Sequence, residues 1–222
     1  MNELKKQIKS LLLVMLMLMV SVAMLTACGG GSEEQEDFSD IEQELASKEA
    51  ATEKAPGIGI HHAEIEIQDY GTIKLELDGD EAPLTVQNFM DLANAGFYDG
   101  LTFHRIMDGF MIQGGDPEGT GMGGSDKTIT GEFSNNGIEN NISHEKGVIS
   151  MARSQDPNSA SSQFFITVAD ADFLDGDYAA FGHVTEGQEV ADKIAADAKP
   201  TDDNGTIPAE AQPVITKITI VD

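Results

Sequence analysis

Alternation of apolar and polar residues first appears near residue 63, and it predicts a β-hairpin. Residues 63–68 read Ala-Glu-Ile-Glu-Ile-Gln, and residues 72–77 read Thr-Ile-Lys-Leu-Glu-Leu. Because side chains two apart lie on the same face of a strand, each segment has one apolar face that can be buried. Tyr70 and Gly71 stand between the segments and favour a tight turn.

Two other segments have helical spacing. Pro83 suits the first turn of a helix, Gly96 suits its end, and apolar residues recur between them at intervals of three or four. These apolar residues are Val86, Phe89, Met90 and Ala93. A second helix is predicted over residues 188–198.

Short apolar runs separated by Gly, Asp and Asn make up most of the remaining sequence. They predict further strands at residues 102–106, 111–114, 148–151, 163–167, 180–184 and 214–221. Many short strands with two helices indicate a mainly β fold, namely a closed β-barrel capped by the two helices.

The first 28 residues have a different character. Lys5, Lys6 and Lys9 precede an apolar run from Leu11 to Leu25, which is typical of a signal peptide. This run is shorter than the roughly 20 residues that span a bilayer comfortably. Residues 25–28, Leu-Thr-Ala-Cys, resemble a bacterial lipobox, which implies cleavage before Cys28 and lipidation of that residue. An uncleaved membrane anchor is the alternative, and both interpretations place the rest of the chain outside the cytoplasm.

Residues 28–57 predict an acidic, flexible stalk that follows a signal peptide at 1–27 and precedes one domain at 58–222. The stalk begins with Gly-Gly-Gly-Ser and is rich in Glu and Asp, with a thin apolar stripe that could form a helix over 39–54. The net charge of −26 argues against nucleic-acid binding. The single cysteine excludes an intramolecular disulfide.

Several motifs of the domain resemble the cyclophilin-type peptidyl-prolyl cis–trans isomerases in order and spacing. They are Phe-His-Arg-Ile-Met-Asp-Gly-Phe-Met-Ile-Gln-Gly-Gly-Asp at 103–116, Gly-Val-Ile-Ser-Met-Ala at 147–152, Ser-Gln-Phe-Phe-Ile at 162–166 and Phe-Leu-Asp-Gly at 173–176. The resemblance covers residues 61–222. It implies an eight-stranded antiparallel barrel with a helix at each end, and a monomer that acts on proline-containing unfolded or exported polypeptides. It implies no cofactor and no metal.

The same resemblance assigns the site residues. Arg105 matches the catalytic arginine, Gln113 the glutamine that orients it, and Phe110 a residue of the proline pocket beside both. The remaining matches to the pocket and groove are Met111, Ala152, Arg153, Gln163, Phe165, Phe173, Leu174 and Tyr178. Phe173 stands where many members carry a Trp whose indole N–H bonds cyclosporin, which implies weak cyclosporin binding. Tyr178 stands where many carry His, and it can still line the pocket and offer a hydroxyl.

The chemistry of the reaction accounts for these residue types. Rotation about an X–Pro bond breaks no bond, so neither a nucleophile nor a metal is required. The transition state is a twisted amide whose nitrogen has gained a lone pair. An arginine aimed at that nitrogen from a dry apolar pocket stabilises the twisted form over both planar forms.

Two other functions remain open: a non-catalytic peptide-binding or scaffold lipoprotein, and a lipoprotein whose acidic stalk docks a cationic partner. Residues 119–124 fit Gly-x-Gly-x-x-Gly, but no predicted helix follows them, so we expect no dinucleotide site and interpret them as a loop beside the groove. Ser143 and His144 suggest a nucleophile only superficially, because no base and orienting group stand near them in the sequence.

Overall fold

A curled eight-stranded antiparallel sheet organises residues 57–221, the part of the chain that this computed structural model describes. The predicted signal peptide, Cys28 and the stalk with its helix lie outside the described residues. The strands are β1 (Ile60–Ile67), β2 (Gly71–Asp78), β3 (Thr102–Met107), β4 (Met111–Asp116), β5 (Val148–Met151), β6 (Phe164–Thr167), β7 (Ala180–Glu186) and β8 (Ile215–Ile220).

The order of strands in the sheet is β3-β4-β6-β5-β7-β2-β1-β8, and each predicted strand is present. The largest difference in bounds is at β1, which begins three residues before the alternating pattern. Its first residue, Ile60, pairs with Asp78 at the far end of β2. Pairing along the whole hairpin therefore extends the strand through His61 and His62, where the sequence has no alternation.

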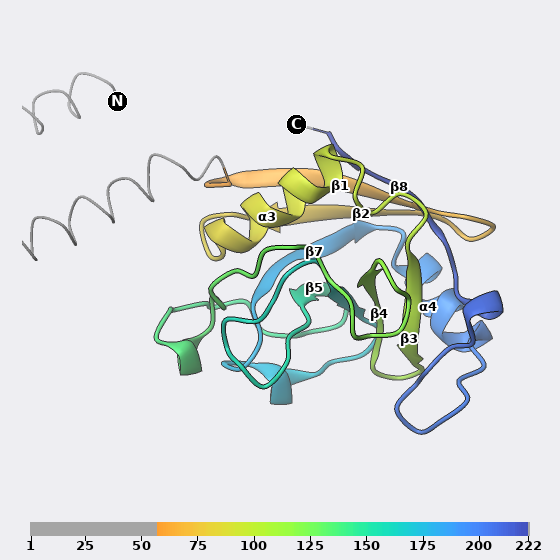
Figure 1. Ribbon diagram of the computed structural model, residues 1–222. Helices are drawn as coiled ribbons and strands as arrows, with labels where there is room; N and C mark the ends of the chain where they lie inside the picture. Colours follow the sequence, from red (N-terminus) through yellow and green to blue (C-terminus); the bar gives the residue numbers. More distant parts are fainter. Residues whose placement is uncertain (1–56, 222) are drawn as a thin grey trace, which may run out of the picture. The chain divides into compact units, whose positions relative to one another are not determined.

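The two end strands of the sheet, β3 and β8, approach each other where β3 begins (Figure 1). Thr102 forms an isolated bridge with Val214, the Phe103 amide donates to the Pro213 carbonyl at 2.9 Å, and the Ile215 amide donates to the Leu101 carbonyl at 2.7 Å. The mainly β, eight-stranded antiparallel architecture is confirmed. Because these contacts join only the first residues of the end strands, full closure of the barrel stays a prediction.

Both predicted helices are confirmed, as α3 (Pro83–Asn94) and α4 (Gln188–Asp197). Helix α3 packs against β2 and β8, and α4 packs against β2 and β4. Figure 1 shows them on different sides of the curled sheet. Among the described residues, neither these helices nor any other is both long enough and apolar enough to cross a bilayer.

The ends of α3 explain its bounds. The buried carboxylate of Glu132 accepts hydrogen bonds from the Leu84 amide at 3.0 Å and the Thr85 amide at 2.8 Å, so it serves free N–H groups of the first turn. At the other end Gly96 has φ +70°, and the Phe97 amide donates to the Leu92 carbonyl at 2.9 Å. This is the glycine-terminated hydrogen-bond pattern in which a helix commonly stops.

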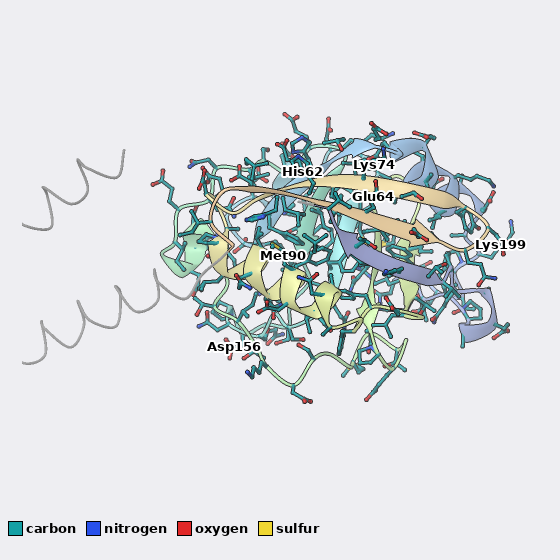
Figure 2. All side chains as sticks on the ribbon, turned by 90° about the horizontal axis from the view of Figure 1, so that it is seen from above. His62, Glu64, Lys74, Met90, Asp156 and Lys199 are labelled. Carbon is teal, nitrogen blue, oxygen red and sulfur yellow. The ribbon has the colours of Figure 1, made fainter. Side chains whose placement is uncertain are left out.

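Phe89 of α3 lies at the centre of the aromatic core. Its ring centroid is 5.3 Å from that of Tyr98, 5.5 Å from Phe164 and 5.3 Å from Phe181. All four rings are fully buried. On the outer surface, Figure 2 shows the polar side chains of the β1–β2 hairpin, among them Glu64 and Lys74, which alternate with buried apolar residues. The hairpin therefore has the buried and exposed faces that its alternation predicts.

Candidate active site

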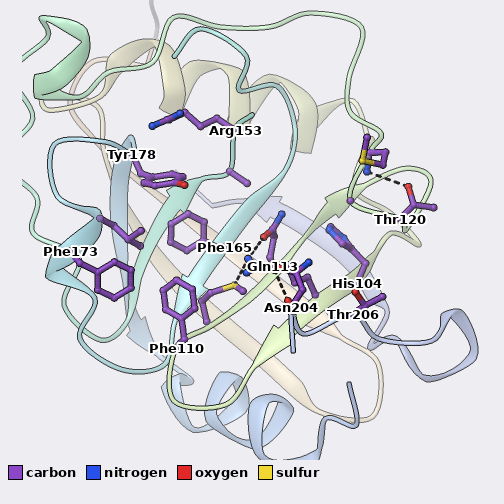
Figure 3. A pocket seen from close by; sticks show the side chains of 16 residues that line it. His104, Phe110, Gln113, Thr120, Arg153, Phe165, Phe173, Tyr178, Asn204 and Thr206 are labelled. Atoms are coloured by element: carbon purple, nitrogen blue, oxygen red, sulfur yellow. Dashed lines mark hydrogen bonds between the residues drawn. The ribbon is translucent and has the colours of Figure 1, made fainter. Parts of the chain in front are cut away.

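A pocket of about 510 Å³ opens beside β3 and β4 and contains almost all of the predicted site residues (Figure 3). These are Arg105, Phe110, Met111, Gln113, Ala152, Arg153, Phe165, Phe173, Leu174 and Tyr178. The exception is Gln163, which lines an adjoining pocket of about 530 Å³ that shares Gln113, Ala152 and Arg153 with the first. The two pockets together form the groove.

Arg105 and Gln113 meet because β3 and β4 place them opposite each other. They are a cross-strand pair in the register of the hairpin, so their side chains lie on one face of the sheet. The Arg105 Nη1 donates to Gln113 Oε1 at 3.0 Å. Gln113 Nε2 in turn donates to Gln163 Oε1 at 2.8 Å, and Gln163 Nε2 donates to the Gly123 carbonyl at 2.7 Å. This chain of hydrogen bonds fixes the position of the Arg105 side chain on the side of Gln113.

A loop that contains Asn204, 99 residues after Arg105, also holds the arginine. The Arg105 Nε donates to the backbone carbonyl of Asn204 at 2.8 Å. Burial lowers the pKa of Arg105, while Tyr178 and Asp202 act in the opposite direction. A guanidinium remains protonated at neutral pH despite such a shift. The group is thus a fixed cation whose Nη2, within residues 57–221, contacts only the weakly accepting Met107 Sδ at 3.4 Å.

The opposite wall of the pocket is apolar. Met111, Phe165 and Leu174 are buried there and share one cluster with Phe110, Ala152 and Tyr178. The Phe110 ring lies 5.4 Å from that of Phe173, which belongs to the 3-10 helix η2 (Asp172–Leu174) and is 69% exposed. Phe173 therefore forms an apolar rim, as the sequence predicts, and projects into solvent.

Arg153 lies over the ring of Tyr178 at the edge of the pocket (Figure 3). Its guanidinium carbon is 4.8 Å from the Tyr178 ring centroid and 5.1 Å from that of Phe133. The Arg153 Nε donates to the Asp177 carbonyl at 2.7 Å, and Nη1 donates to the Ser154 carbonyl at 2.8 Å. Two rings and two carbonyls thus hold this side chain in one orientation.

The loop at 119–124 borders both pockets through Gly121 and Met122, which agrees with the predicted groove-side loop. Asp116 anchors it by accepting hydrogen bonds from the amides of Glu118, Thr120 and Gly121. Burial acts to raise the pKa of Asp116, but these backbone donors and that of Gly123 lower it below its usual value. The amides of the Gly-x-Gly-x-x-Gly segment therefore serve a carboxylate of the chain itself.

An arginine with fixed donors beside a buried apolar pocket is the arrangement that the resemblance predicts. The family model of the cyclophilin type peptidyl-prolyl cis-trans isomerases matches residues 62–221. The chain belongs to this family.

Similar proteins support the assignment. A peptidyl-prolyl cis-trans isomerase-like protein of Rhizopus delemar is 47% identical over 125 residues, which cover 56% of this chain and 74% of that protein. A peptidyl-prolyl cis-trans isomerase A of Dickeya dadantii is 47% identical over 131 residues, covering 56% and 66% of the two chains. The crystal structure of a cyclophilin type isomerase of Cryptosporidium parvum has a TM-score of 0.65 and 30% identity, and covers 74% of this chain and 99% of that one.

This cyclophilin also contains a hydrogen-bonded array that the sequence did not reveal. His144 Nδ1 is 2.7 Å from Asp175 Oδ1, and His144 Nε2 is 3.0 Å from Ser150 Oγ. This array does not activate Ser143, because the serine beside the imidazole is Ser150 and Ser143 Oγ instead donates to Asp175 Oδ2 at 2.6 Å. Ser150 is fully buried, however, so it cannot reach a substrate. The imidazole instead stacks under Phe165, with centroids 6.1 Å apart, and supports the pocket floor.

Sequence reasoning missed three further residues that line the cyclophilin pocket: His104, Asn204 and Thr206. Asn204 and Thr206 belong to the segment Asp-Asp-Asn-Gly-Thr, whose Asn-Gly pair indicates a turn. That signal predicts a loop, but no local pattern relates this loop to Arg105.

Proposed function

We propose that this cyclophilin accelerates cis–trans isomerisation of X–Pro bonds in exported polypeptides and so assists their folding at the outer face of a membrane. The observation that carries the catalytic part is the Arg105 guanidinium, held by Gln113 and by the Asn204 carbonyl beside the apolar pocket. A structure of the Cryptosporidium parvum relative was determined in the presence of the dipeptide Ala-Pro, which supports a proline-containing ligand for this pocket.

The proposed mechanism needs only binding and electrostatics. Phe110, Met111 and Phe165 receive the proline ring, and the dry wall strengthens any charge interaction within the pocket. Arg105 donates to the amide nitrogen as it twists and loses conjugation. Since the uncatalysed exchange takes tens of seconds, an acceleration of about 10⁴-fold corresponds to roughly 5.5 kcal/mol of preferential stabilisation. A few charge-assisted hydrogen bonds that exist only in the twisted state are of the right size.

The direct test is a proline-isomerisation assay on a short peptide, with the soluble domain and its Arg105→Ala variant. We expect the substitution to lower kcat/KM by about 100-fold or more, because it removes the donor aimed at the reacting nitrogen. Thermal unfolding should show that the variant is folded. If the intact domain gave no rate above background, the enzyme proposal would fail and a non-catalytic peptide-binding module would be favoured.

The location is proposed from the sequence of the first 28 residues. Lipid on Cys28 would anchor the protein, because each buried CH₂ contributes about 0.8 kcal/mol and several acyl chains on one cysteine give stable attachment. Metabolic labelling with a radioactive fatty acid tests this: the full chain should be labelled, and Cys28→Ser should not. An unlabelled full chain would refute lipidation, and protection from added protease in intact cells would refute the outer location.

We also propose weak binding of cyclosporin. Phe173 retains an apolar rim beside Phe110 but lacks the indole N–H donor that the family's usual Trp offers to cyclosporin. Phe173→Trp should therefore tighten cyclosporin binding by about tenfold, as one added hydrogen bond allows. Calorimetric titration measures this, and tight binding that the substitution leaves unchanged would contradict the proposal.

A further inference from the structure

The two arginines of the chain both lie in the groove. The sequence contains only Arg105 and Arg153, and both line the first pocket, although the net charge of the chain is −26. No Asp or Glu is among the residues that line either pocket of the groove. The groove is thus a cationic region in a strongly acidic protein.

Neither arginine is neutralised by an ion pair within residues 57–221. Lysines on the surface do find carboxylates: Lys74 lies 2.8 Å from Glu186, and Lys146 lies 2.8 Å from Asp192. Carboxylates are abundant on the surface of this protein, but within residues 57–221 none of them forms an ion pair with Arg153.

Arg153 is already oriented for a ligand. Its guanidinium lies over the rings of Phe133 and Tyr178, and two of its five N–H groups donate to carbonyls. Within the described part of the chain, its Nη2 has no protein acceptor. Because the side chain is already held in place, little rotamer entropy is lost when a carboxylate binds to it.

We propose that Arg153 makes this cyclophilin prefer substrates that carry a Glu or Asp side chain within a few residues of the isomerising proline. The inference rests on the proposed isomerase function and names the substrate class of the same groove. Arg105 serves the proline itself, so Arg153 is the remaining unpaired cation beside the pocket. A pair at this partly exposed position should change kcat/KM by about 2- to 5-fold.

The overall negative charge of the protein opposes an acidic ligand, but it acts at longer range. At 0.15 M salt the screening length is about 8 Å, so distant carboxylates are largely screened while a direct contact with Arg153 is not. Once Arg153 is removed, Arg105 is the one arginine left in the groove, and in the proposed mechanism it is engaged with the proline amide, so the negative field of the protein dominates at the flanking residues of the substrate. The preference should then shift from acidic towards basic peptides.

The test uses peptides that differ at one position, with Glu, Gln or Lys placed two residues before the proline, and a second set with these residues two after it. We expect kcat/KM for the intact domain, measured by NMR exchange at 0.15 M salt, to follow Glu over Gln over Lys in at least one set. In Arg153→Gln the ratio of Glu to Lys should fall to one or below. Arg153→Lys should retain part of it.

A matched control is Lys217→Gln on β8, which changes the net charge equally at an exposed residue that lines neither pocket of the groove. It should keep the order of the intact domain. A second measurement needs no variant: raising the salt from 0.05 to 0.5 M screens the distant carboxylates more than the direct contact with Arg153, so the intact domain should still turn over Glu peptides faster than Lys peptides.

Equal rates for Glu and Lys peptides in both sets, or a Glu preference that survives in Arg153→Gln, would overturn the inference while leaving the isomerase proposal intact. Failure to turn over even the uncharged Gln peptides would overturn both. The two failures are distinguishable because the Gln peptides offer Arg153 no charge.

Discussion

Other residues determine where the charge of Arg105 lies. The carboxamide of Gln113 and the carbonyl of Asn204 accept from two different nitrogens of the guanidinium. These two acceptors leave Nη2 and part of Nη1 for the substrate. A lysine at this position would keep the charge but lose the planar fork of donors that these contacts orient.

His144 makes a residue-level contribution to stability that depends on pH. Its side chain is fully buried between Asp175 and Ser150. Burial lowers the pKa of His144, and Asp175 only partly opposes this effect. Burial also lowers the pKa of His104. Both imidazoles are therefore neutral in the folded protein near pH 7.

We predict that the free energy of unfolding falls as the pH is lowered from 7.5 to 5.5. A folded-state pKa below the ordinary value of about 6.5 means that the unfolded chain binds more protons, so the stabilisation is complete above 6.5 and is lost below it. Each histidine contributes a slope of at most about 1.4 kcal/mol per pH unit.

Urea denaturation at several pH values measures this slope. His144→Gln should reduce the slope, whereas the same substitution at His183, an exposed residue of β7, serves as the control and should not. A free energy of unfolding that stays constant between pH 7.5 and 5.5 would show that protonation of the buried imidazoles does not destabilise the folded protein.

At the scale of elements, the loop at 202–206 is hydrogen-bonded to β3, the strand that carries Arg105. Asp202 Oδ1 accepts from the amides of Asn204 and Thr206, both at 3.0 Å, and its Oδ2 accepts from Thr206 Oγ1 at 2.8 Å. The loop is joined to the strand by the Ile106 amide, which donates to the Gly205 carbonyl at 2.8 Å. Gly205 has φ +85°, and a Cβ there would lie 2.6 Å from the Ile106 carbonyl oxygen, so the close approach requires glycine.

We predict that Asp202→Ala lowers kcat/KM by about 3- to 10-fold, because the loop loses the side-chain acceptor that holds the Asn204 carbonyl against Arg105. Asp203→Ala is the matched control, since it makes the same charge change in the adjacent exposed residue. Equal losses in the two variants would point to a general charge effect, and no loss in either would remove the loop from the mechanism.

For the molecule as a whole, α3 and the sheet share one aromatic core. Phe89 connects the helix to Tyr98, Phe164 and Phe181, and Phe164 belongs to β6, next to the pocket residue Phe165. Successive residues of this strand thus face the core and the substrate. Loosening of the core is expected to reach the pocket through β6.

We predict that Phe89→Ala lowers the free energy of unfolding by about 3–5 kcal/mol, the usual cost of deleting a buried phenylalanine. Leu84→Ala on the same helix should have little effect, because Leu84 is 39% exposed. Denaturant titration compares the two variants. A decrease of less than about 1 kcal/mol in the free energy of unfolding of Phe89→Ala would contradict this prediction, and would mean that neighbouring side chains fill the space left by the ring.

The sequence by itself determined the strands, both helices and the identity of most groove residues. Alternation and helical spacing report which side of each element is buried, and these are local properties. The motif around Arg105 also determines that Arg105 and Gln113 lie opposite each other, because both residues belong to one hairpin. The start of β1 was misplaced, since pairing with β2 decided it.

Only the tertiary structure decided which distant residues support the site. Asn204 meets Arg105 across 99 positions of the chain, Asp175 meets His144 across 31, and Tyr178 lies under Arg153. No local periodicity encodes such contacts, because they arise when the curled sheet brings its loops together. For the same reason the unneutralised charge of Arg153 became visible only in the fold, where the surrounding carboxylates could be located.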